Sequence, residues 1–284
     1  MKKINNLIVL VLSIFIGSTF VFADEKYFYN NISISKEDYN NLINLGFTPN
    51  EIENMNEEEY NINKAIEGRV VSSITEYYET KTEYDKNNTI ISTTSKKITG
   101  LDYENKNNKV DLKGYNGYIE TNYKKMTTQI IQLQNSYRYK ISLEWKTIPK
   151  NRNYDIIGIG ITSNVFIGSS VIFQQNYCLK NGNCATTGGI IKKTATGGAA
   201  LFQLPTSSSV NSLSSYLCFD VNKNTSATIT ELYAYGDYAH STTSVNNISS
   251  SDYSINTSGI AIGTKFTTKF DEIPVAKAYW QGNW

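Results

Sequence analysis

The sequence is poor in the residues that usually build metal and imidazole sites, because it has one histidine and three cysteines in 284 residues. Cys178 and Cys184 lie close together, whereas Cys218 and the histidine, His240, lie far along the chain. A tetrahedral zinc site needs four such ligands at matched spacing. The run Gly158-Ile159-Gly160 lacks the third glycine and the following helix of a dinucleotide fingerprint. We therefore expect neither a metal site nor a cofactor.

An excess of one charge is also lacking. The chain has 27 basic and 26 acidic residues, and without the two lysines of its first 23 residues it has 25 and 26, a net charge of −1. Binding to nucleic acid needs a clear basic excess, so nucleic acid is not an expected partner. The charge is uneven, however: residues 24–67 hold ten acidic and three basic residues (−7), which leaves +6 on residues 68–284. Such asymmetry often marks two parts that attract one another or face different partners, and one hypothesis is that residues 24–67 dock on the basic body. The alternative is an acidic solvated helix face beside a mildly basic domain.

Long apolar runs are absent except near the start. Lys2 and Lys3 precede an apolar run over residues 7–16, and Val21-Phe22-Ala23 provides small residues at −3 and −1 of a cleavage site. This pattern predicts a signal peptide over residues 1–23. Its apolar core is too short to span a bilayer stably, and no other stretch is long enough. We expect a secreted, extracellular protein without a stable membrane anchor.

The segment 24–67 carries helix signals. Ser35 is a capping residue, and Gly46 ends the apolar pattern that follows it. Thr48-Pro49-Asn50-Glu51 combines a capping threonine, a proline at the first helical position and a glutamate three residues after the cap. Asn56-Glu57-Glu58-Glu59 repeats the start signal. These signals predict three short helices, with Phe47 in the crook between them.

From residue 69 the pattern alternates between polar and apolar side chains. In Tyr137–Trp145 every odd position is apolar or aromatic and every even position is polar, which predicts a half-buried strand. Other expected strands are 69–79, 89–99, 109–112, 126–134, 154–161, 165–175, 199–204, 217–221, 227–240, 259–263 and 275–280. Many short strands without interleaved helices predict a mainly β protein, with an antiparallel β-sandwich or barrel-like domain over residues 68–284.

The cysteines suggest one disulfide bond. Cys178 and Cys184 bracket Asn181-Gly182, a strong signal for a tight turn, so a bridge across a hairpin is expected. Cys218 lies in an apolar run and is then left free; exchange of Cys218 with one of the other two stays open.

Several segments resemble uncharacterised secreted proteins of low-GC Gram-positive bacteria. They are the block Leu45-Gly46-Phe47-Thr48 with Glu51 to Met55, the strand pair from Trp145 to Ile159, the run 199–205, and Tyr235-Gly236-Asp237-Tyr238-Ala239-His240. The resemblance implies export and β-architecture, and it carries no activity or catalytic residue.

Tyrosine is abundant, with 21 residues, and three tryptophans add to the aromatic content. Aromatic side chains on a sheet face can stack on sugar rings or anchor a protein partner. Packing in the core is the alternative, most clearly for Trp145, and the terminal Trp284 either docks on the fold or is exposed. The candidate ligand-binding residues are Trp145, Tyr233, Tyr235, Tyr238, Trp280 and Trp284.

These features favour a secreted, non-catalytic protein that binds a glycan or a protein outside the cell. A second hypothesis is an exported hydrolase that uses His240 or a pair of carboxylates such as Glu144 and Glu231, which requires the acting groups to converge at a cleft. A third is a β-pore-forming toxin with residues 186–198 or 241–258 as its membrane hairpin, although neither segment sustains the alternation of a spanning strand.

Overall fold

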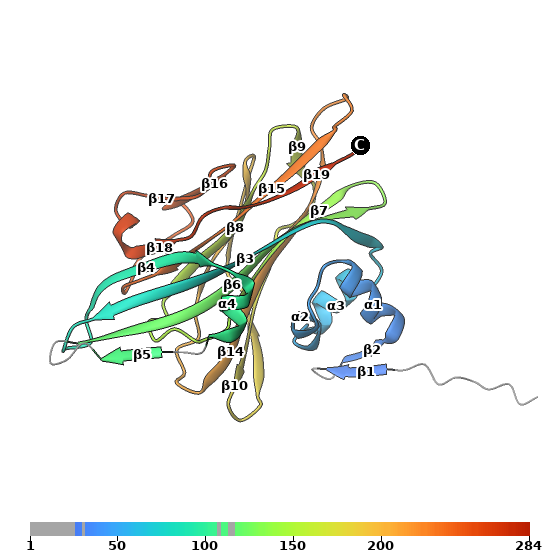
Figure 1. The fold of residues 1–284 in the computed structure, drawn as a ribbon. Coiled ribbons are helices and arrows are strands. Elements are labelled where there is room, and N and C mark those ends of the chain that lie inside the picture. The colour runs from blue at the N-terminus through green and yellow to red at the C-terminus, as the bar shows by residue number, and fades with distance from the viewer. Residues whose placement is uncertain (1–25, 30–31, 107–108, 113–116) are drawn as a thin grey trace, which may run out of the picture.

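The computed structural model describes residues 26–29, 32–106, 109–112 and 117–284 (Figure 1). The predicted signal peptide lies outside these residues. The helices are α1 (Lys36–Asn44), α2 (Pro49–Glu53), α3 (Glu57–Asn63), α4 (Gly100–Asn105) and the 3-10 helix η2 (Thr267–Lys269). The strands are β1 (Lys26–Tyr29), β2 (Ile32–Ser35), β3 (Gly68–Tyr84), β4 (Ile90–Ile98), β5 (Lys109–Leu112), β6 (Tyr118–Leu133), β7 (Tyr137–Trp145), β8 (Tyr154–Gly160), β9 (Val165–Ile167), β10 (Ile172–Leu179), β11 (Cys184–Thr187), β12 (Ile190–Thr194), β13 (Gly197–Gln203), β14 (Val210–Lys223), β15 (Glu231–Ser241), β16 (Tyr253–Asn256), β17 (Gly259–Ile262), β18 (Phe270–Glu272) and β19 (Ala276–Gln281).

The chain is mainly antiparallel β, as the alternating pattern predicts, and two large sheets form the body. Sheet I has the order β11-β10-β14-β7-β6-β3-β4, with β5 beside β6 and β9 beside β14. Sheet II has the order β12-β13-β8-β15-β18, with β19 beside β15. Strand β19 of sheet II also contacts sheet I: the backbone N–H of Tyr279 in β19 donates to Oγ of Ser72 in β3 at 3.1 Å. The arrangement is sandwich-like.

The main core lies between the two sheets. Sheet I contributes the odd positions of β7, among them Ile141 and Trp145, and sheet II contributes Ile157, Leu232 and Tyr238. Because successive side chains of a strand point to opposite faces, this assignment sends the even positions of β7 to the outer face of sheet I.

The helices α1 to α3 cover that outer face (Figure 1). Ser35 and Thr48 cap α1 and α2 through their side chains, Thr48 and Glu51 form a full capping box, and Gly46 has a φ of +78° that favours glycine. Phe47 is buried and contacts the ring of Tyr216 edge-on. The short helices were therefore placed correctly from the sequence.

The helices over the outer face of sheet I correct one prediction about β7. This strand was expected to be half-buried, with polar side chains in solvent, but Lys140 and Arg138 are 0% and 3% exposed. They are buried because the helices lie over them. The alternation of the strand identifies its two faces, but it does not show that a second layer covers the polar face.

Other expectations were adjusted locally. The expected strand 165–175 is divided into β9 and β10 around Gly168, and α4, capped by Thr99, was not expected. The segment 241–258 and the strands β16 and β17 pack on the outer face of sheet II around Ile255, Tyr253 and Phe266. Among the described residues no helix is both long and apolar enough to cross a membrane.

Candidate functional site

Three tyrosines gather on the outer face of sheet II, where β15 and β19 run side by side. Tyr233 lies directly opposite Tyr279 in the register of these strands, and Tyr235 lies opposite Lys277. The ring centroids of Tyr233 and Tyr279 are 5.1 Å apart and those of Tyr233 and Tyr235 are 6.1 Å apart, with interplanar angles of 30° and 31°. Tyr279 is 42% exposed. The three rings therefore form a cluster of tilted aromatic side chains, with Tyr279 exposed and Tyr233 and Tyr235 partly exposed, which we call the tyrosine face.

Charged side chains hold the tyrosine face in place. Glu231 accepts hydrogen bonds from the hydroxyl groups of Tyr233 at 2.5 Å and Tyr279 at 3.1 Å. The Lys277 ammonium lies 4.0 Å from the centroid of the Tyr233 ring and 5.7 Å from that of Tyr235. The hydrogen bond to Glu231 raises the pKa of Tyr233 to about 12. The hydroxyl groups therefore stay protonated at neutral pH, and the rings are held in a fixed orientation.

A polar groove of about 420 Å³ begins at Tyr233 and Glu231. Its size falls within the usual range for small-ligand sites. Apart from Glu231 and a few apolar atoms, the lining offers hydroxyl and amide groups: Thr162, Ser163, Asn164, Thr225, Thr228 and Thr230. Aromatic rings beside a groove rich in neutral hydrogen-bonding groups suit an uncharged, polyhydroxylated ligand.

The six candidate ligand-binding residues do not lie together in the structure. Tyr233 and Tyr235 belong to the tyrosine face, but Trp145 and Tyr238 are buried between the sheets, where Nε1 of Trp145 donates to the Tyr238 hydroxyl at 3.2 Å. Those two rings are core residues because they occupy inward positions of β7 and β15, and they offer no surface to a ligand.

Trp280 and Trp284 pack on Tyr137, each with a centroid distance of 4.9 Å. Trp284 also exchanges backbone hydrogen bonds with Ile229, at 2.9 and 3.0 Å, so the terminal residue docks on the fold. Sequence reasoning named Trp280 and missed Tyr279, although the alternation of β19 separates the two: even positions face the core and odd positions face solvent.

Of the residues in the hydrolase hypothesis, His240 meets a carboxylate, but not at a cleft, and Glu144 and Glu231 do not meet. Nδ1 of His240 lies 2.9 Å from Oδ1 of Asp155, and the Tyr238 hydroxyl donates to the same carboxylate. His240 is 3% exposed, and the space beside it is too small for a water molecule. Glu144 instead pairs with Lys125 at 2.6 Å on sheet I. No cluster of three or more potential metal ligands occurs within the described part of the chain.

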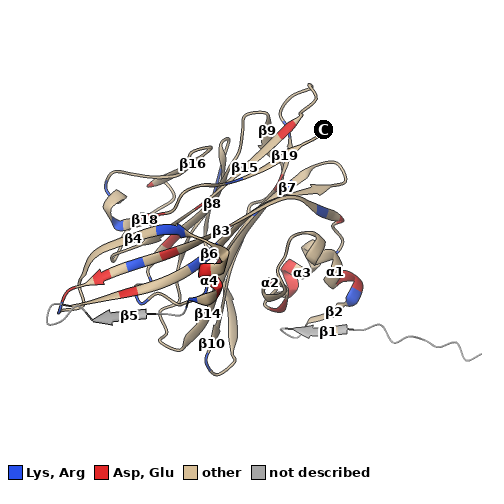
Figure 2. Ribbon diagram, viewed as in Figure 1, with Lys and Arg blue, Asp and Glu red and all other residues tan. Residues whose placement is uncertain are grey.

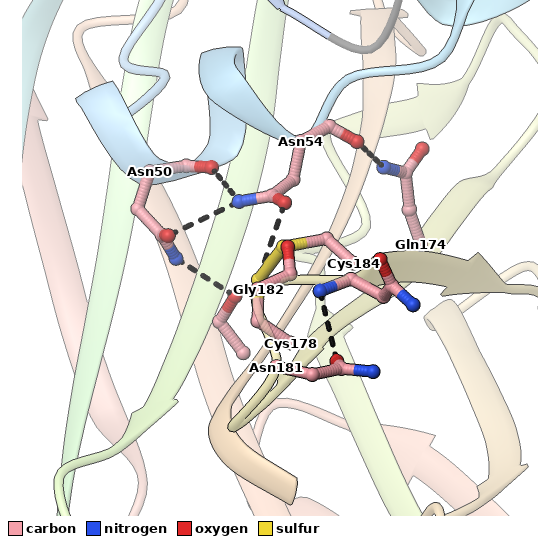
Figure 3. The surroundings of a disulfide bond; sticks show 9 residues. Asn50, Asn54, Gln174, Cys178, Asn181, Gly182 and Cys184 are labelled. Atoms are coloured by element: carbon pink, nitrogen blue, oxygen red, sulfur yellow. Dashed lines mark hydrogen bonds between the residues drawn. A yellow bond between two sulfur atoms is a disulfide. The ribbon is translucent and has the colours of Figure 1, made fainter.

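The predicted disulfide bond joins Cys178 and Cys184, which are paired across β10 and β11 (Figure 3). The turn between them contains Gly182, with a φ of +87°. The hairpin lies against α2, where Oδ1 of Asn54 is 3.6 Å from Sγ of Cys178 and the Asn54 carbonyl accepts from Gln174. The bridged hairpin therefore lies at the contact between α2 and sheet I. Cys218 is free and buried.

Comparisons with known proteins add little to this description. No protein-family model and no curated protein matches the sequence. Two solved structures show a similarity, each with 8% identity and a TM-score of 0.30. One is titled BspA_C_WT, with 77% of this chain and 93% of that chain covered; the other is the C-terminal domain of the Streptococcus agalactiae AgI/II polypeptide BspA, with 73% and 85% covered. Similarity at this level supports no argument about fold or function.

Proposed function

We propose that the chain is a secreted, non-catalytic binding protein whose tyrosine face and adjoining groove recognise a glycan outside the cell. The observation that carries the proposal is the cluster of three tyrosine rings, partly or fully exposed, on the paired strands β15 and β19. Such rings stack on the apolar faces of sugar rings, and the hydroxyl and amide groups of the groove can bond to sugar hydroxyls.

The shape of the site favours a glycan over a protein partner. The tyrosine face continues into a groove, and the hydroxyl groups of Tyr233 and Tyr279 are already bound by Glu231, so these two rings offer aromatic surface rather than free donors. A protein interface of standard size would need a larger surface with a buried apolar centre. An extended oligosaccharide could occupy both the rings and the groove.

A glycan array probed with the mature protein tests the proposal. For a glycan that binds, Tyr233→Ala and Tyr279→Ala are each expected to weaken affinity about tenfold, because each change removes a stacking ring worth roughly 1.4 kcal/mol. Phe166→Ala is the matched control, since this ring is 44% exposed and lies on β9 of sheet I. Absence of any bound glycan, or equal affinity in all three variants, would contradict the proposal.

A further inference from the structure

Two lysines of sheet I are completely buried, and they differ in how their ammonium groups are satisfied. Nζ of Lys140 donates to Oε1 and Oε2 of Glu51 at 2.9 and 2.7 Å, to Oγ of Ser142 at 2.7 Å and to the Gly46 carbonyl at 3.1 Å. A buried ammonium with this many partners is well compensated for the loss of water. Lys140 and Glu51 therefore form a stable buried ion pair.

Lys124 has a much poorer environment. Its side chain is 0% exposed, and its Nζ donates to one oxygen of Asp271 at 3.4 Å. Two rings lie beside it: Nζ lies 5.1 Å from the centroid of Trp145 and 5.3 Å from that of Tyr238. The charges of Asp155 and Asp237 also act on this ammonium, and like that of Asp271 they oppose the effect of burial. Burial lowers the pKa of Lys124. This environment disfavours an ammonium and favours a neutral amine, which is nucleophilic.

The partner carboxylate belongs to a row of polar side chains on the inner face of sheet II. Asp155 of β8 is paired with His240 of β15, which in turn is paired with Asp271 of β18. Asp155 is occupied by His240, Tyr238 and the backbone N–H of Ser241. Asp271 is bound by the Ser95 hydroxyl and by Lys124. The carboxylate that faces the lysine is therefore Asp271.

We propose that Lys124 and Asp271 join in an intramolecular amide bond between the two sheets. The ammonium proton first moves to the Asp271 carboxylate, which leaves a neutral amine facing a neutral acid. The amine attacks Cγ of Asp271, a C–N bond forms, a C–O bond breaks, and the hydroxyl group leaves with one amine proton as water. Nothing is oxidised or reduced, and no other group has to supply a proton.

The fold supplies both requirements of this condensation. The groups are held on opposing rigid sheets, which replaces a bimolecular encounter by an intramolecular one with a high effective concentration. Surrounding rings exclude water from the amine, and the space beside His240 does not admit water. In such a dry site a neutral amide replaces two buried charges whose desolvation is costly.

Peptide mapping of the folded, secreted full-length product tests the proposal. The protein is denatured, reduced and digested with trypsin, and the peptides are analysed by tandem mass spectrometry. The expected result is a branched peptide in which Lys124 is joined to Asp271, lighter than the two linear peptides by one water and uncleaved after Lys124. Lys140 is the internal control: its ammonium is fully satisfied by Glu51, so trypsin should cleave after it and release linear peptides.

Three variants sharpen the result. Lys124→Met and Asp271→Ala should yield linear peptides, whereas Asp271→Asn should still form the bond by losing ammonia, with a product of the same mass as that of the unaltered protein. Recovery of Lys124 and Asp271 in separate linear peptides from the unaltered protein overturns the proposal, and so does a bond from Lys124 to another acid. The unaltered protein decides the question even if a variant fails to fold.

Discussion

Single ionisable residues connect the acidic helices to sheet I. Acidic residues lie on the helices α2 and α3, which are partly red in Figure 2. Glu51 of α2 meets the buried Lys140 of β7. Glu51 bonds to Lys140, and Nη1 of Arg138 donates to Oδ1 of Asn63 at 2.6 Å. The uneven charge of the sequence is thus partly explained by contacts within the molecule. Removing one partner of such a buried pair costs far more than removing a surface charge.

Glu59, which is buried in α3, should make the free energy of unfolding depend on pH. Burial, and secondarily the nearby charge of Glu51, raises the pKa of Glu59 from 4.5 to about 8. The folded protein therefore holds a proton that the unfolded chain releases between these values, so the free energy of unfolding should fall as pH rises from about 4.5 to 8. Glu59→Gln mimics the protonated acid, so it should reduce the fall in the free energy of unfolding over this pH range by roughly 4–5 kcal/mol, as measured by urea unfolding.

The control for this measurement is Glu58→Gln, which changes an exposed glutamate of the same helix and should leave the slope as it is. Burial also raises the pKa of Asp237, to about 7, which adds a slope of the same sign in every variant. The decisive quantity is therefore the difference between the Glu59 and Glu58 variants. Parallel pH profiles would show that Glu59 is not protonated in the folded protein.

Among the elements, β19 shows how one strand serves two purposes. Its odd positions place Tyr279 and Lys277 on the tyrosine face, and its even positions place Trp280 on Tyr137 in the core. The residues that follow turn back, so that Trp284 pairs with Ile229 beside the groove. The strand thereby holds both the binding surface and the end of the chain.

Substitutions on the two faces of this C-terminal segment should therefore separate stability from binding. Trp284→Ala removes a partly buried ring from Tyr137 and should lower the free energy of unfolding by about 1–2 kcal/mol. Tyr279→Ala removes an exposed ring and should change it by less than about 0.5 kcal/mol. Urea unfolding measures both, and an equal loss in the two variants would contradict the assignment of the faces.

Across the whole molecule, the sequence predicts local structure more reliably than it predicts how the helices and the two sheets pack on one another. The caps of α1 and α2, the bounds of β7 and the Cys178–Cys184 hairpin follow from neighbouring residues, so the sequence predicts them directly. The burial of Lys140 depends on a helix about 90 positions away, and the position of Tyr279 depends on which face of β19 meets the core. Such contacts come from tertiary packing, which one sequence without its fold does not reveal.

The docking of the helices can be followed through Cys218. This thiol is completely buried in the cluster of apolar residues beneath α1 to α3, and burial raises its pKa to about 11. Glu51→Ala leaves the Lys140 ammonium without its carboxylate and should loosen the helices by about 3–5 kcal/mol. Labelling of Cys218 by a thiol reagent under native conditions should then be at least tenfold faster than in the unaltered protein.

Glu53→Ala is the matched control, because Glu53 is an exposed glutamate of the same helix, α2. Its labelling rate should equal that of the unaltered protein. Rapid labelling of Cys218 in all three proteins would show that the helices do not shield this face, and it would remove the structural explanation for the charge asymmetry.

The fully paired ammonium of Lys140 has a consequence for a protein exposed to proteases. The stretch between α3 and β3, residues 64–67, is mostly exposed and is the natural place for a nick. Cutting there would not release the N-terminal piece, since its departure would strand Lys140 in an apolar surface and uncover Phe47 and Cys218 together. The two fragments of the cut protein would stay associated in one folded structure.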